Sequence, residues 1–159
     1  MSTDKREQIL SRLFTVLKGV TGVATDDDGN PCVYRNRGEL PAEKRPGILL
    51  LDADEEASQM VRERGRITQS PNLVTIKPEI YITLSSAKPQ NEDVGESLNA
   101  FRMRVLKAVL TDATLKSLVG NNGEIYYAGA ISDLARGRAM EGEMGIALWL
   151  TYVFNPNDL

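Results

Sequence analysis

The residues best suited to chemistry are two aspartates at the end of an apolar run. Asp52 and Asp54 follow the run from Gly47 to Leu51, within the sequence Asp-Ala-Asp-Glu-Glu. Phosphoryl-transfer enzymes place paired carboxylates in this way to hold Mg²⁺. Such enzymes also need a phosphate-binding loop and a larger α/β framework, which these 159 residues do not supply. We therefore favour an acidic surface turn and keep a small Mg-dependent phosphoryl-transfer enzyme as an alternative.

A second acidic segment resembles part of a calcium-binding loop but fails at two positions. Counting Asp26, Asp28 and Asn30 as the first ligands puts Pro31 where a glycine is required and Arg37 where a glutamate is required. The sequence also contains no Gly-x-x-x-x-Gly-Lys phosphate loop and no Gly-x-Ser-x-Gly nucleophile motif. We interpret this segment as a solvated turn and expect no metal and no cofactor.

The lack of histidine excludes several kinds of catalysis. Ser-His-Asp and Cys-His mechanisms and histidine zinc sites all need this residue type. Cys32 is the single cysteine, and we interpret it as a structural thiol. The net charge of -3 argues against a generally basic surface for nucleic acid. We expect a protein that is not an enzyme.

Arginines cluster in two segments that we expect to be loops. Arg62, Arg64 and Arg66 lie in the middle of the chain, and Arg136 and Arg138 flank a glycine near its end. Arginine binds carboxylates and phosphates through a planar set of donors, so these loops suit acidic protein surfaces or a phosphate backbone. Neither cluster has interleaved aromatic residues for base stacking. A nucleic-acid-binding module remains a less favoured alternative.

The spacing of apolar residues predicts the elements that position these groups. Composition is that of an ordinary globular protein, with 42% hydrophobic and 26% charged residues, and we expect one domain over residues 1–159. The N-terminal residues lack the apolar block of a secretory signal, and no apolar stretch is long enough to span a membrane. The expected elements are helices between residues 4 and 19, 91 and 110, and 113 and 119, and strands at 33–35, 47–52, 73–84, 124–131 and 143–154.

This order predicts an α+β fold: a mainly antiparallel sheet of about four strands, with two long helices packed on one face. A long loop is expected at about residues 53–71. Within the strand at 73–84, Pro78 implies an edge position or a bulge. The last strand is apolar on both faces, so Trp149 or Tyr152 is expected in the core or at a subunit contact.

Three runs resemble a known family. Residues 33–41 (Val-Tyr-Arg-Asn-Arg-Gly-Glu-Leu-Pro), 45–52 (Arg-Pro-Gly-Ile-Leu-Leu-Leu-Asp) and 149–156 (Trp-Leu-Thr-Tyr-Val-Phe-Asn-Pro) are similar to minor tail and tail-terminator proteins of long-tailed, siphovirus-like phages. The order of the expected elements also matches that family over nearly the whole chain. The resemblance therefore covers a single tail-terminator-like domain.

The resemblance implies a virion structural protein made in the host cytoplasm and located at the head-proximal end of the tail. Such proteins form a ring, usually hexameric, that stops polymerisation of the tail tube and forms the head-tail joining surface. The implied partners are further copies of the chain, the tail tube protein and a head-completion connector protein, with DNA passing through the lumen without specific binding and no membrane involved. A neck or head-completion connector protein is the nearest alternative. The expected subunit or partner contacts are Arg62, Arg64, Arg66, Arg136, Arg138, Trp149 and Tyr152.

Overall fold

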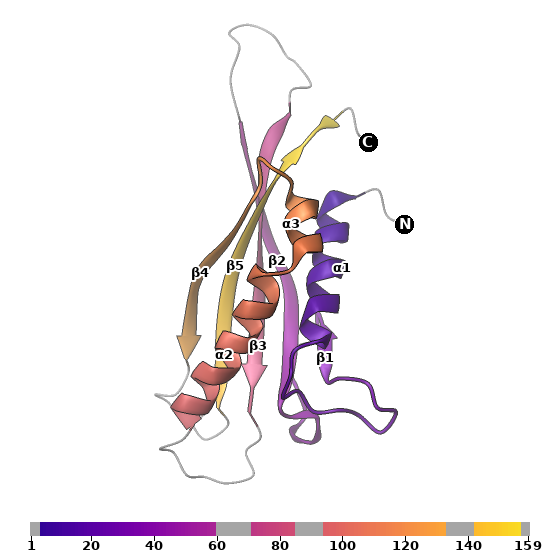
Figure 1. The fold of residues 1–159 in the computed structure, drawn as a ribbon, viewed down its shortest axis with the longest axis vertical. Coiled ribbons are helices and arrows are strands. Elements are labelled where there is room, and N and C mark those ends of the chain that lie inside the picture. The colour runs from indigo at the N-terminus through magenta and orange to yellow at the C-terminus, as the bar shows by residue number, and fades with distance from the viewer. Residues whose placement is uncertain (1–3, 60–70, 85–93, 133–141, 157–159) are drawn as a thin grey trace, which may run out of the picture.

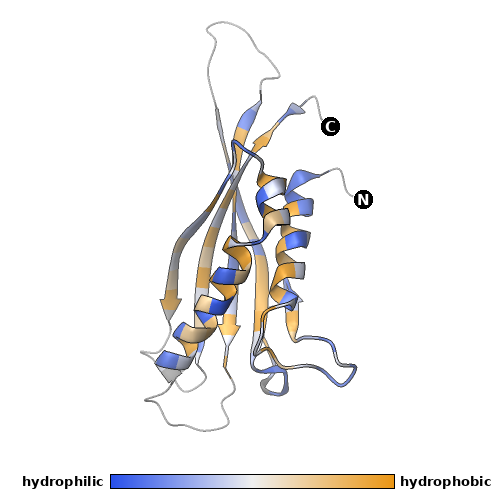
Figure 2. Cartoon of the chain, in the orientation of Figure 1, coloured by the Kyte–Doolittle hydropathy of each residue, from blue (hydrophilic) through white to orange (hydrophobic). Residues whose placement is uncertain are grey.

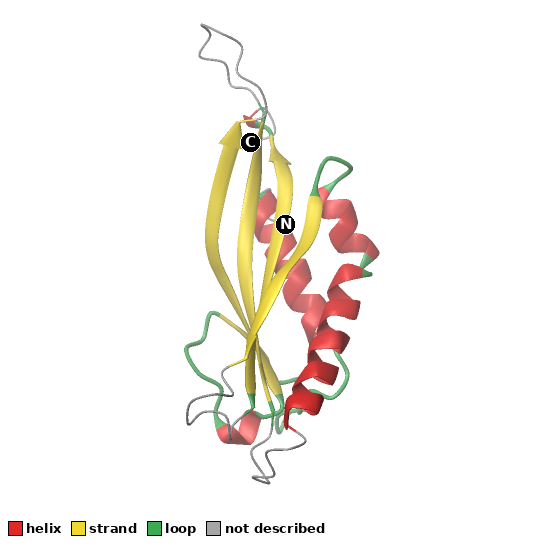
Figure 3. Cartoon of the chain, turned by 90° about the vertical axis from the view of Figure 1, so that its left-hand side faces the viewer, coloured by secondary structure: helices red, strands yellow, loops and turns green. Residues whose placement is uncertain are grey.

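The described part of the chain folds into a five-stranded sheet with three α-helices on one face (Figures 1 and 3). The structure, a computed structural model, describes residues 4–59, 71–84, 94–132 and 142–156. The helices are α1 (Lys5–Lys18), α2 (Val94–Leu110) and α3 (Ala113–Val119), with a 3-10 turn η1 (Ala42–Lys44). The strands are β1 (Val33–Arg35), β2 (Gly47–Gln59), β3 (Asn72–Thr83), β4 (Glu124–Ser132) and β5 (Glu143–Phe154).

The sheet is mixed, with strand order β1-β2-β3-β5-β4. β1 runs parallel to β2, and the other neighbours are antiparallel. The prediction of about four antiparallel strands and two long helices is therefore wrong, although the α+β class holds. The link at residues 36–46 contains η1 and brings the chain back to start β2 beside the start of β1, so the two strands run in the same direction.

The helices meet the sheet through the apolar positions that the sequence spacing identified. α1 begins after Asp4, whose side chain accepts a hydrogen bond from the Arg6 N–H, and α3 begins after Asp112 in the same manner. Apolar positions along both long helices and along alternate strand positions form one core, which the hydropathy colouring of Figure 2 follows. Cys32 is fully buried in it, as expected of a structural thiol. Within the described ranges, no helix combines the length and apolar character needed to cross a membrane.

The expected loop at residues 53–71 is wrong in its first part, because β2 continues as a strand to Gln59. Residues Asp54 to Gln59 pair with β3 from Lys77 back to Asn72. The side chains of residues 54–58 are all exposed, so this half of the strand shows no alternation of apolar and polar residues. Its pairing with β3, a long-range interaction, makes it a strand.

Pro78 occupies the central strand, opposite a bulge in β2. Leu51 pairs with Glu79 and Asp54 with Lys77, so Asp52 and Ala53 together face Pro78. Of the two predictions for this proline, the edge position is wrong and the bulge is confirmed. The extra residue of β2 accommodates a partner that has no N–H to donate.

Candidate functional site

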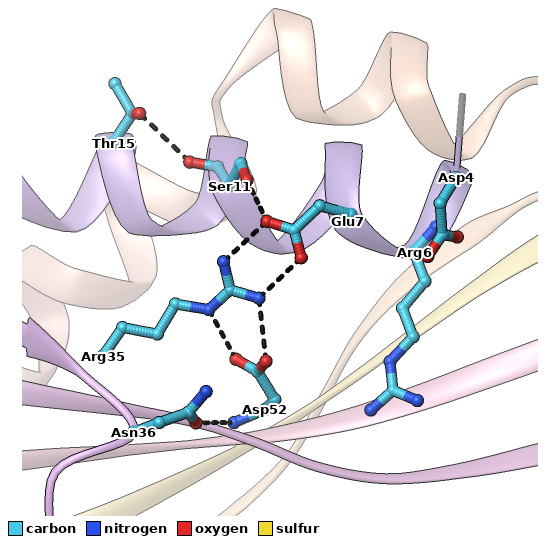
Figure 4. Close-up of polar contacts among 8 residues, drawn as sticks. All are labelled: Asp4, Arg6, Glu7, Ser11, Thr15, Arg35, Asn36 and Asp52. Carbon is cyan, nitrogen blue, oxygen red and sulfur yellow. Dashed lines mark hydrogen bonds and ion pairs between the residues drawn. The ribbon is translucent and has the colours of Figure 1, made fainter. Parts of the chain in front are cut away.

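The acidic motif that suggested metal chemistry is bound by an arginine of the same chain. Arg35 on β1 donates from Nε to Asp52 Oδ1 at 2.7 Å and from Nη2 to Asp52 Oδ2 at 2.8 Å. Its remaining face donates to both carboxylate oxygens of Glu7 on α1, at 2.8 and 2.9 Å (Figure 4). We call Glu7, Arg35 and Asp52 the arginine clamp. Such two-pronged pairs are the strong form of the ion pair.

The ion pairs of the clamp stabilise the charged form of all three groups and shift the pKa of each accordingly. Hydrogen bonds from Arg35 and then from Ser11 lower the pKa of Glu7 from 4.5 to about 2. Hydrogen bonding from Arg35 likewise lowers the pKa of Asp52, and the two carboxylates raise the pKa of Arg35. In the described chain, no group of three potential ligands stands ready for a metal ion. The arrangement ties α1, β1 and the β2 bulge together.

Two further hydrogen bonds hold the backbone of the β2 bulge beside the clamp. The Asn36 side chain accepts from the Asp52 N–H at 3.0 Å, and Arg6 Nη2 donates to the Ala53 carbonyl at 3.0 Å. Asn36 and Ala53 have φ of 55° and 51°, a region that costs L residues about 1 kcal/mol. This corner of the sheet is thus held in a strained shape by polar contacts.

A second region, on the sheet face opposite the helices, is apolar and exposed. Four large hydrophobic side chains among the described residues are exposed, and three of them lie here: Tyr126 at 50%, Ile131 at 79% and Trp149 at 41%. The rings of Tyr126 and Trp149 are 5.8 Å apart between centroids. We call Tyr126, Ile131 and Trp149 the open-face patch. Ile131 lies farther along β4, opposite Gly145. Exposed apolar groups gathered on one face in this way mark interaction sites.

Charged side chains of β2 and β3 border the open-face patch. Lys77 Nζ lies 4.8 Å from the centroid of the Trp149 ring and pairs with Glu56 at 2.9 Å. Such a cation over an indole face is attracted by the ring. The patch is therefore amphipathic, with an apolar centre and a charged border.

A shallow pocket of about 400 Å³ continues the patch toward the other end of β5. Tyr81 donates to Glu79 at 2.7 Å, and this bond, with burial, raises the pKa of Tyr81 to about 12. Gly145 faces Tyr81 across the strand pair, and a Cβ at Gly145 would lie 3.1 Å from the tyrosine ring. The absence of a side chain at Gly145 therefore leaves room for the Tyr81 ring beside β5. Its lining residues are Glu79, Tyr81, Ile131, Glu143, Gly145, Ile146 and Ala147.

Two of the seven predicted contact residues are among those that the structure describes, and they lie on opposite faces of the sheet. Trp149 is in the open-face patch, whereas Tyr152 is 3% exposed on the helix side of β5, where burial raises its pKa to about 12. These two residues are therefore on opposite faces and form no common site. The five predicted arginine contacts lie outside the described residues: Arg62, Arg64, Arg66, Arg136 and Arg138.

Sequence reasoning missed two members of the patch and the clamp as a unit. Tyr126 and Ile131 lie on β4, whose residues from Ile125 to Ser132 include no charged side chain. That uncharged run is the available signal, and by itself it predicts only a strand. Arg35 and Glu7 could not be linked to Asp52, because nothing in the sequence relates positions so far apart.

Comparison of the chain with protein-family models gives no match, and comparison with curated proteins gives none either.

Proposed function

We propose that this protein is a virion structural protein of the tail-terminator type. It assembles as a ring on the head-proximal end of a tail tube, stops tube polymerisation and forms the surface that joins the head. The observation that carries the proposal is the one-sided sheet, whose face away from the helices holds the open-face patch. The similarity of residues 33–41, 45–52 and 149–156 to tail-terminator proteins supports the same role.

The distribution of chemistry in the molecule supports assembly over catalysis. The carboxylate best placed for metal chemistry, Asp52, has both oxygens bound by Arg35. Three of the four exposed large hydrophobic side chains of the described residues lie instead on two adjacent strands, so one surface presents them together. An aromatic centre with a charged border is the usual composition of a protein-protein contact.

Electron microscopy of negatively stained samples tests the proposal. The purified protein is imaged across a concentration series, alone and mixed with its tail tubes. Rings, and caps confined to one end of the tubes, are the expected result. Particles that never form rings and never bind tubes would overturn the proposal. Binding to the head connector without binding to tubes would instead assign the protein to the neck.

A further inference from the structure

The sheet has two strand edges without a neighbour in the described chain. β4 ends the sheet on one side, and its outer edge pairs with no other strand of the described residues. On the other side β1 covers only Ile48 to Leu50 of β2, and contacts from Asn36 and Arg6 cap the chain as far as Ala53. Beyond Ala53, the outer edge of β2 is open. An open edge presents backbone donors and acceptors that another strand can pair with.

We propose that the β4 edge of one copy pairs with the β2 edge, Asp54–Gln59, of a second copy of this chain, which makes the ring a continuous sheet. This inference rests on the proposed function, because it names the contact that builds the ring. After Glu124, β4 lacks the charges and prolines that normally protect an edge: none occurs from Ile125 to Ser132. Two of the exposed apolar side chains, Tyr126 and Ile131, are on the same strand.

Strand direction makes this pairing a head-to-tail contact. β2 and β5 are both antiparallel to β3 and so run in the same direction, while β4 runs against β5. β4 of one copy and β2 of the next are therefore antiparallel when the two copies have the same orientation. A contact between two different surfaces repeats from copy to copy and closes into a ring when the rotation allows.

The positions of the two open edges give the strand tilt that closure needs. Four residues are aligned across the sheet, each opposite the next: Glu56, Thr75, Thr151 and Glu124. The open part of β2 and the strand β4 therefore begin at nearly the same height in the sheet and extend toward opposite ends of it. To pair β4 of one copy with the open part of β2 of the next, the two copies must be shifted along the strands by about four residues, or about 13 Å. One copy is five strands wide, at about 4.8 Å per strand. That slide tilts the strands by about 30°, close to the 35–45° of closed barrels.

Charge selects the β4–β2 pairing over the two symmetric ones. The β2 edge carries Asp54, Glu55 and Glu56, so two β2 edges would repel each other. Beside the middle of β4, Arg102 donates to the Tyr127 hydroxyl at 3.0 Å, and no described carboxylate forms an ion pair with Arg102. After the slide, Glu55 of the neighbour is on the same face of the sheet as this arginine, whereas Asp54 and Glu56 are on the open face. Two β4 edges would instead bring two such cations together.

A pair of charge variants tests the contact. The first carries Tyr126→Glu and Ile131→Glu on β4, and the second carries Asp54→Lys and Ser58→Lys on β2, all at exposed positions. Each variant alone should need at least about tenfold more protein to assemble, measured by sedimentation and native mass spectrometry without tubes. An equal mixture should recover assembly, because the introduced glutamates face the introduced lysines and the other edges are unchanged. The control is Met103→Glu, exposed on α2, which should assemble normally.

The outcomes separate the contact from the function. If the β2 variant assembles like the unmodified chain while the β4 variant fails, β4 pairs with β4 and the inference is overturned. If both variants assemble, or the mixture shows no recovery, it is also overturned. If the unmodified chain forms no oligomer, both the proposed contact and the proposed ring are wrong. If rings form and respond as expected but never bind tubes, the contact stands and the proposed function fails. Melting curves establish that each variant is folded.

Discussion

Two cation-centred clusters of this molecule use their charges in different ways. In the arginine clamp, Arg35 binds two carboxylates on elements far apart in sequence, and each oxygen has a partner. On the open face, Lys77 lies over an exposed indole and pairs with an exposed carboxylate. The first cluster holds the fold together, and the second leaves apolar surface available. Substitution in each should therefore affect a different property.

Removal of the clamp cation is expected to give the largest effect. Arg35→Met leaves Glu7 and Asp52 facing each other without the cation, which should cost about 2–3 kcal/mol of unfolding free energy. Urea unfolding measures this loss. Arg37→Met is the matched control, because Arg37 is exposed and lies over the Tyr34 ring, with no ion pair to a described carboxylate. Equal losses for the two variants would show that the clamp has no special role.

Truncation of the patch is expected to affect assembly. Trp149→Ala should weaken ring formation by about 1 kcal/mol, or about fivefold in concentration, because the indole packs against Tyr126 on the strand that forms the proposed contact. The free energy of unfolding should change much less, because the ring is 41% exposed in the single chain. The control is Met103→Ala on the opposite side of the molecule. A Trp149 variant that assembles normally would remove the patch from the interface.

Acid should weaken the clamp and leave the patch unchanged. The folded pKa of Glu7 is depressed from 4.5 to about 2, so its contribution to stability is present above pH 4.5 and is lost as the pH falls toward 2. Glu7→Gln should be less stable than the unmodified chain at pH 7, and the two melting temperatures should converge between pH 4.5 and 2. A difference that stays constant over this range would contradict the ionic role of Glu7.

The smallest expected effect is at the strained bulge beside the clamp. Ala53 has φ of 51°, so Ala53→Gly should relieve strain and raise the unfolding free energy by about 0.5–1 kcal/mol. Ala57→Gly on the same strand, where φ is not positive, should instead lower it. Chemical denaturation of both variants gives the comparison. The same sign for the two changes would show that the bulge stores no strain.

The sequence by itself determined the helices, the strands with alternating residues and the single apolar core. Spacing of three and four placed α1 and α2, and a period of two placed β3 and β5, because burial of one face imposes those periods. It also separated Trp149 from Tyr152, since residues three apart on a strand point to opposite faces. Whether either residue contacts another subunit stays a prediction.

Only the tertiary structure decided the direction of β1, the strand conformation of the outer half of β2 and the central position of Pro78. β1 has too few residues for a pattern to show which way it runs in the sheet. The side chains of Asp54 to Ser58 are exposed on both faces of the sheet, so this segment has no alternation of apolar and polar residues. Pro78 sits in a central strand because β2 supplies an extra residue opposite it. The clamp likewise depends on Glu7, Arg35 and Asp52 meeting across three elements. Such long-range pairings are set by packing and hydrogen bonding between segments, which local patterns do not encode.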